Sequence, residues 1–117
     1  EELHARGINV IAVTIPPTGG AWVATYGDFW MGDDRRAVNS WIRNTGNRHV
    51  PGVASTTRYP DGFWDLSKAV QDANDVRQLP SLVTWDNVHP NSAGYKKFID
   101  DTATAGKLGL LRGRTCS

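Results

Sequence analysis

Residues 8–15 are the feature that most limits what this chain can fold into. They are almost wholly apolar and rich in β-branched side chains, and the Pro/Gly-rich segment 16–20 follows them directly. Such a run is typical of a parallel strand that helices cover on both faces, because neither face of that strand meets water. Proline and glycine favour turns, so the strand should end at Ile15. We therefore expect an α/β fold.

The segment 16–20 is also a candidate wall of a binding site. In open α/β sheets, ligands bind beyond the carboxyl ends of the strands, which is where this segment lies. Pro17 and Gly19 belong to it and are our candidates for contact with a substrate.

The expected sheet is short of strands. Only residues 63–66 offer a second strand, and the first strand needs parallel neighbours to pair its backbone groups. Residues 1–7 resemble the last turns of a helix that ends at Gly7, without an N-cap before it. We predict that a missing N-terminal segment, a second copy of this chain or another protein completes the sheet.

Two helices are expected in the middle of the chain. The first spans residues 33–44, with Val38, Trp41 and Ile42 at helical spacing on its inner face. The second is short, is capped by Ser67 and runs to residue 73. Residues 75–85 then form a loop, in which Pro80 breaks any helix.

A further helix should start near residue 91, with Asn91 or Ser92 as its cap. Its inner face should hold four residues at helical spacing: Tyr95, Phe98, Ile99 and Thr102.

Composition narrows the class of protein. A chain of 117 residues suits one domain, here residues 1–105, followed by a tail at 106–117. A formal net charge of +1 gives no strong attraction to nucleic acid or to an anionic membrane, so neither partner is expected. No apolar stretch approaches the ~20 residues that a transmembrane helix needs. Cys116 is the only cysteine and cannot form a disulfide within the chain.

The strongest chemical signal is the pair Asp86 and His89, three residues apart and just before the last expected helix. A single turn can fold the carboxylate back onto the imidazole. The carboxylate then holds one ring nitrogen, and the other nitrogen is left as a base that can take a proton from a serine hydroxyl. Pro90 stiffens the chain and keeps His89 extended. This spacing favours acid–base chemistry.

The full string of residues 86–95, Asp-x-x-His-Pro-Asn-x-x-Gly-Tyr, closely resembles the last motif block of the GDSL/SGNH hydrolases. Segments 5–11 and 14–17 resemble that family's helix, strand and Pro loop, and segment 36–43 resembles it as well. The resemblance runs from about residue 1 to about residue 104 and covers only the later part of a family domain.

This resemblance implies a three-layer α/β/α fold with a flavodoxin-like parallel sheet, present here as an incomplete C-terminal part. It implies an esterase or lipase that works through an acyl-serine, with His89 as general base and Asp86 as the acid that orients it. Neither cofactor nor metal would be needed. The substrate would be a small ester or an acylated carbohydrate, and relatives of this type suggest an exported protein.

The nucleophile of that family is not evident in this chain. The family places it in a Gly-Asp-Ser motif, whereas residues 27–29 read Gly-Asp-Phe, with Phe29 at the serine position. The Gly and Asn that complete the family's oxyanion hole are not evident either. Ser92 is better explained as a helix cap. The other serines considered as substitutes lie in helical or turn-like contexts: Ser40, Ser55, Ser67 and Ser81.

The tryptophans leave a second hypothesis open. Four tryptophans flank expected loops, and packing in a core or an interface is the favoured role for all of them: Trp22, Trp30, Trp64 and Trp85. They could instead stack on a sugar or line an acyl chain, especially Trp85, which stands next to Asp86. The chain would then be a non-catalytic carbohydrate- or lipid-binding module, or a fragment that only assembles with other subunits.

Histidines other than His89 carry no comparable signal. His4 and His49 have no carboxylate at a useful spacing and are expected to be exposed to solvent. A metal site built from Asp33, Asp86 and His89 is not expected, because nothing beyond the one Asp/His pair shows metal-ligand spacing.

Overall fold

The computed structural model describes residues 2–27, 32–46 and 59–107. In chain order, the elements are α1 (Glu2–Ala5), β1 (Ile11–Val13), α2 (Gly20–Tyr26), α3 (Gly32–Gly46), β2 (Gly62–Trp64), α4 (Leu66–Val70), a 3₁₀ turn (Pro80–Leu82) and α5 (Ser92–Thr104). Several expectations lie outside the described residues: those on Asp28, Phe29, Trp30, His49, Ser55, Cys116 and the tail from residue 108 onward.

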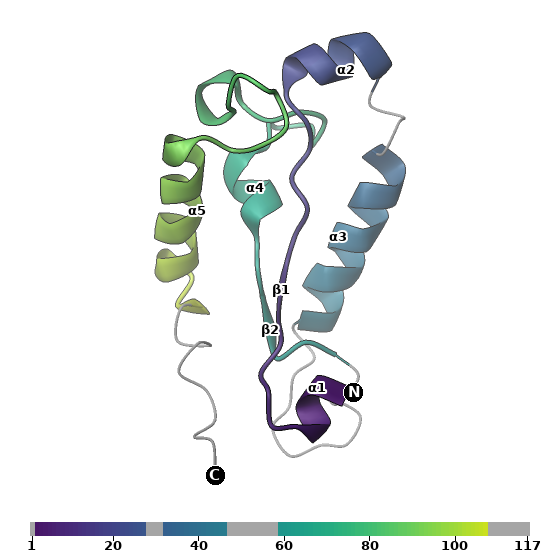
Figure 1. Ribbon diagram of the computed structural model, residues 1–117, viewed down its shortest axis with the longest axis vertical. Coiled ribbons are helices and arrows are strands. Elements are labelled where there is room, and N and C mark those ends of the chain that lie inside the picture. Colours follow the sequence, from purple (N-terminus) through teal and green to yellow (C-terminus); the bar gives the residue numbers. More distant parts are fainter. Residues whose placement is uncertain (1, 28–31, 47–58, 108–117) are drawn as a thin grey trace.

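β1 and β2 form a small parallel sheet, with Ile11 opposite Gly62 and Val13 opposite Trp64. α3 contacts both strands, and Trp64 of β2 meets Phe98 of α5 edge to face, with ring centroids 6.2 Å apart. The sheet therefore lies between α3 and α5, as Figure 1 shows. The prediction of a mixed α/β fold with a parallel sheet is confirmed at this level.

β1 is shorter than the apolar run that predicted it, and side chains bond to the backbone just beyond both of its ends. The backbone N–H of Val10 donates to the Asp61 carboxylate at 2.6 Å. The amide of Asn39 accepts from the backbone N–H of Ile15 and donates to its carbonyl, both at 2.7 Å. Apolar composition predicted the strand, and these two polar side chains supply hydrogen-bond partners to the backbone on either side of it.

α3 occupies the expected region, but the prediction of its inner face is partly wrong. Ile42 is buried as expected, whereas Val38 and Trp41 are 43% and 53% exposed. Arg35 and Asn39 are buried in their place. Each of them is hydrogen-bonded in the fold, Arg35 to Asp75 and Asn39 to the backbone of Ile15, and this offsets the cost of burying a polar group.

Asp65, rather than Ser67, caps α4. The Asp65 carboxylate accepts from the backbone N–H of Lys68 at 3.2 Å. Ser67 is fully buried inside the helix, where its backbone N–H donates to the Thr14 hydroxyl at 2.9 Å. The helix ends at Val70 instead of residue 73.

α5 begins as predicted, with Asn91 as N-cap accepting from the backbone N–H of Gly94 at 2.9 Å. Phe98 and Thr102 are buried as expected, but Tyr95 and Ile99 are each 46% exposed. Gly94 explains the difference, because a Cβ there would lie 2.6 Å from the Leu82 carbonyl oxygen. The helix approaches its neighbours most closely along the face that holds Gly94.

The hydrophobic core lies between α4 and α5. Its buried cluster consists of Ala69, Val70 and Phe98, and three partly buried residues pack against it: Trp64, Leu66 and Leu82. Among the helices of the described residues, none is long and apolar enough to cross a membrane.

The expectation that His4 is exposed is wrong. Its side chain is only 8% exposed, and its Nε2 atom lies 2.8 Å from the carboxylate of Asp61. These two residues are 57 positions apart in the sequence, so no local spacing could have paired them.

Candidate active site

Residues 84–89 fold into a tight turn that brings His89 back to Asp86. The backbone N–H of Asn87 donates to the Thr84 carbonyl at 3.0 Å, and the N–H of Thr84 donates to the His89 carbonyl at 2.9 Å. Asn87 adopts the left-handed backbone region, with φ of 57°, which asparagine tolerates better than most residues. The chain leaves the turn through Pro90, which pairs with Val83.

The Asp86 carboxylate is held by four donors within this turn. Its Oδ2 atom lies 2.7 Å from Nδ1 of His89. Its Oδ1 atom accepts from the backbone N–H groups of Val88 and His89, at 2.8 and 3.0 Å, and from the Thr84 hydroxyl. The hydrogen bond from Thr84, followed by that from His89, holds the pKa of Asp86 well below its ordinary value.

This contact sets the chemical state of the neutral imidazole. An ionised carboxylate only accepts hydrogen bonds, so the ring proton lies on Nδ1, where Asp86 can accept it. Nε2 then carries the lone pair and can act as a base. The His89 side chain is 68% exposed, and no group of the described residues is hydrogen-bonded to Nε2.

None of the described serines is hydrogen-bonded to His89. Ser92 is exposed at the first residue of α5, and Ser40 and Ser81 are exposed elsewhere. Ser67 is fully buried, and its hydroxyl lies 2.9 Å from the side chain of Gln71. The arrangement within the described residues can orient a base, but none of the described serine hydroxyls is hydrogen-bonded to that base.

The Pro loop after β1 packs against this turn. The backbone N–H of Gly19 donates to the Asn87 carbonyl at 2.6 Å. Pro17 and Gly19 are both buried, so they lie behind the turn rather than on an open wall. The predicted site residues therefore do come together, at the carboxyl end of β1, with Asp86 and His89 outside and the Pro loop beneath them.

α2 adds two aromatic residues to the candidate site: Trp22, which the sequence analysis considered only among several tryptophans, and Tyr26, which it did not consider. The rings of Trp22 and Tyr26 contact each other at a tilt of 32°, with centroids 4.8 Å apart, and the Trp22 indole N–H donates to the Asp86 carbonyl at 2.9 Å. Their spacing of four residues was the available signal. This spacing did not predict a helix, because the segment begins with glycines and Gly19 at the N-cap supplies no side-chain hydrogen bond that would mark a helix start.

A hollow of about 270 Å³ separates α2 from the turn. Trp85 stands on its rim and is 94% exposed. Its lining combines aromatic rings with groups of the turn: Ala21, Trp22, Thr25, Tyr26, Trp85, Asp86 and Asn87. A small ligand bound there would touch the same turn that carries His89.

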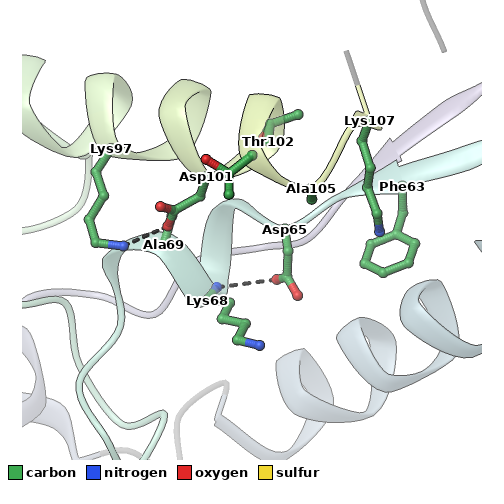
Figure 2. Close-up of a pocket in the computed structure, with 10 residues that line it drawn as sticks. Phe63, Asp65, Lys68, Ala69, Lys97, Asp101, Thr102, Ala105 and Lys107 are labelled. Carbon is green, nitrogen blue, oxygen red and sulfur yellow. Dashed lines mark hydrogen bonds and ion pairs between the residues drawn. The ribbon is translucent and has the colours of Figure 1, made fainter. Parts of the chain in front are cut away.

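A larger hollow of about 500 Å³ lies between α5 and the β2–α4 segment (Figure 2). Lys97 pairs there with Asp101 at 2.6 Å, and the Lys107 ammonium sits 3.3 Å from the centre of the Phe63 ring. Burial lowers the pKa of Lys107. No residue of the turn 84–89 lines this hollow, so we do not assign the active site to it.

Metal-binding groups do not gather in the described part of the chain. There, no three His, Cys, Asp or Glu side chains lie close enough together to hold an ion. Asp33 is occupied in α3, where its carboxylate accepts from Arg36 at 2.8 Å.

Fold and site together define a mixed α/β protein with a small parallel sheet and an exposed aspartate–histidine pair. No family model matches the sequence, and no curated protein matches it either. Among solved structures, the chain is similar to a Bacteroides fragilis protein described as a "putative acylhydrolase", with a TM-score of 0.59 and 23% identity. The similarity covers 93% of this chain and 47% of that one, so this chain spans about half the length of that structure. At this level of identity, the likeness establishes a shared fold.

Proposed function

We propose that this chain carries the acid–base half of a carboxylic-ester hydrolase of the GDSL/SGNH type. In this proposal a serine hydroxyl attacks the ester carbonyl while Nε2 of His89 takes its proton. His89 then gives that proton to the leaving alcohol, and in the second half of the cycle it activates the water that releases the acid. Asp86 orients the ring and stabilises its protonated form.

One observation carries the proposal. The Asp86–His89 contact of 2.7 Å holds Nδ1 and directs the basic nitrogen of an exposed ring outward. A surface histidine without such a partner would rotate freely and would lack a fixed tautomer. The similarity in fold to the Bacteroides fragilis protein supports a hydrolase in general terms.

We further propose that the nucleophile and the oxyanion donors come from a segment that joins the open side of the sheet. β2 pairs with one edge of β1, and no strand of the described residues pairs with the other edge. This segment belongs either to the same polypeptide or to another chain. It would bring the serine to the carboxyl end of the strands, where His89 lies.

The substrate in this proposal is a small ester or an acylated carbohydrate. The exposed ring of Trp85 and the aromatic wall of Trp22 and Tyr26 offer apolar faces beside the base. The same aromatic wall favours the second candidate, a binding module for carbohydrate or lipid without turnover. Replacing Trp85 by Ala weakens ligand binding under both hypotheses, but only the enzyme also needs His89.

The deciding experiment measures p-nitrophenyl acetate hydrolysis by the complete polypeptide that contains this sequence. We expect His89→Ala to lower kcat/KM by roughly 10³-fold or more, the usual effect of removing a member of a catalytic triad. Asp100→Asn is the matched control, because Asp100 is an exposed carboxylate of α5 that pairs with Lys96 at 2.6 Å. It should leave the rate unchanged.

Labelling with a fluorophosphonate probe, followed by peptide mass spectrometry, should identify the reacting serine in the same protein. Full activity of His89→Ala would show that His89 is not the base. Ligand binding without hydrolysis or labelling would favour the binding module.

A further inference from the structure

Gln78 connects the two segments that build the candidate site. It is fully buried, although its side chain is polar. Its Nε2 atom donates to the carbonyl oxygens of Pro17 and Val88, both at 2.7 Å. Its backbone N–H donates to the Thr18 carbonyl at 2.9 Å. One side chain therefore joins the Pro loop after β1 to the turn that carries His89.

The orientation of this amide is determined by its surroundings. Two carbonyl oxygens converge on Nε2, and the opposite rotamer would direct Oε1 against both of them. Oε1 itself has no hydrogen-bond partner within the described residues. Leaving a buried acceptor unpaired carries a cost, and the two carbonyls would be left unpaired as well if the amide were lost. Gln78 thus acts as a double donor.

Both backbone groups of Val88 are hydrogen-bonded to side chains. Its N–H donates to the Asp86 carboxylate at 2.8 Å, and its carbonyl, on the peptide bond that leads into His89, accepts from Gln78. The same Gln78 amide also donates to the carbonyl of Pro17. Two residues further along the chain, the Gly19 N–H donates to the Asn87 carbonyl at 2.6 Å. A shift of Gln78 would move the backbone of His89 relative to the Pro loop.

We infer that Gln78 is a positioning residue of the proposed ester hydrolysis. Its amide holds the Asp86–His89 turn at a set position over the Pro loop, so that the imidazole stays aligned with the incoming hydroxyl. This inference rests on the proposed function for its catalytic consequence, while the positional consequence concerns this chain alone. Misplacing a catalytic group by about 1 Å costs up to roughly a hundredfold in rate.

The first test compares Gln78→Met with the wild type by NMR, using the ¹⁵N-labelled chain. Methionine has a similar length and removes both donors. We expect the low-field proton resonance of His89 Nδ1 to move or broaden, and the amide signals of Gly19 and His89 to shift. Gln78→Asn, which keeps an amide but shortens the side chain, is the milder variant and should give smaller shifts in the same direction.

Ile42→Ala separates positioning from general loss of stability. Ile42 is also buried, but it lies on α3, which packs against β1 and β2. It should lower Tm and leave the His89 signals in place. Gln78→Glu adds a chemical readout, because an ionised carboxylate repels both carbonyls and a protonated one donates to one of them. Its shifts should diminish as the pH falls.

In the complete polypeptide, Gln78→Met should lower kcat for p-nitrophenyl acetate about tenfold or more and change KM less than about twofold. Unchanged His89 signals in Gln78→Met and Gln78→Asn, or equal shifts in Ile42→Ala, would overturn the inference. If the wild type does not hydrolyse the ester, the proposed function fails, and the NMR comparison still decides what Gln78 does.

Discussion

Asp86 is the most heavily bonded carboxylate of the candidate site. Its four donors all lie within residues 84–89. A sequence pattern could therefore predict its contact with His89, because the loop that closes between them has only two residues. The lowered pKa of Asp86 follows from the same contacts, since each of them favours the ionised form.

Replacing Thr84 by Val should raise the pKa of Asp86 toward its ordinary value, because the Thr84 hydroxyl is the largest cause of the lowering. The sign follows from linkage: a lowered folded-state pKa stabilises the fold above the ordinary aspartate range. That contribution disappears as the pH falls through the folded-state value. A ¹³C carboxyl titration of wild type and Thr84→Val measures the shift. Equal midpoints in the two proteins would contradict this account.

His4 and Gln78 show the opposite case at the scale of single residues. The partner of His4 is 57 positions away, and Gln78 reaches a carbonyl 61 positions away. Nothing in their local sequence distinguishes them from surface polar residues. Only the path of the chain brings in the carboxylate and the carbonyls that allow them to be buried.

At the scale of elements, close approach between the Pro loop and the turn supports the site. Gly19 has an extended backbone that any residue could adopt, with φ of −75° and ψ of 171°. A Cβ at this position would nevertheless lie 2.6 Å from Oδ1 and 3.0 Å from Cβ of Asn87. The glycine is therefore required by space rather than by conformation.

Gly19→Ala should destabilise the protein by about 1–3 kcal/mol, the usual cost of forcing an extra methyl into a packed contact. Gly20→Ala is the matched control. Its Cβ would meet nothing closer than 3.7 Å, and alanine suits a helix better than glycine. Chemical denaturation gives both free energies of unfolding. A Gly19→Ala protein as stable as Gly20→Ala would mean that the loop and the turn are not packed as described.

α3 shows why the inner face of a helix was harder to predict than the helix itself. Helical spacing placed Val38 and Trp41 inside, but Arg35 and Asn39 occupy that face. Hydrophobic periodicity assumes that polar groups seek water. Arg35 instead donates to the Asp75 carboxylate at 2.8 Å, and Asn39 pairs with both backbone groups of Ile15.

On the scale of the whole molecule, one edge of β1 has no strand partner among the described residues. β1 pairs only with β2 among the described residues, and apolar side chains in β1 and beside it in the sequence are exposed: Ile8 by 45%, Val13 by 40% and Ile15 by 43%. An open edge with exposed apolar residues promotes association. The sequence analysis predicted a partner here from the shortage of strands, and that partner stays a prediction.

The isolated chain should therefore associate in solution, and Val13→Lys should reduce this association, because lysine on an edge strand opposes further pairing. Ile99→Lys is the control, since Ile99 is 46% exposed on α5, away from this edge. Light scattering over a range of concentrations measures the mass. A monomeric wild type, or an equal effect of both variants, would argue against pairing at this edge.

The sequence by itself determined the features that depend on neighbours along the chain: the apolar strand, the N-cap of α5 at Asn91, and the Asp86–His89 turn. These follow from side-chain chemistry acting over a few residues. The tertiary structure decided which faces are buried, that Asp65 caps α4, that His4 is paired, and that α2, Gln78 and the Pro loop converge on the turn. Those outcomes depend on contacts between segments far apart in the chain, and burying a polar group is favourable only after its distant partner has arrived.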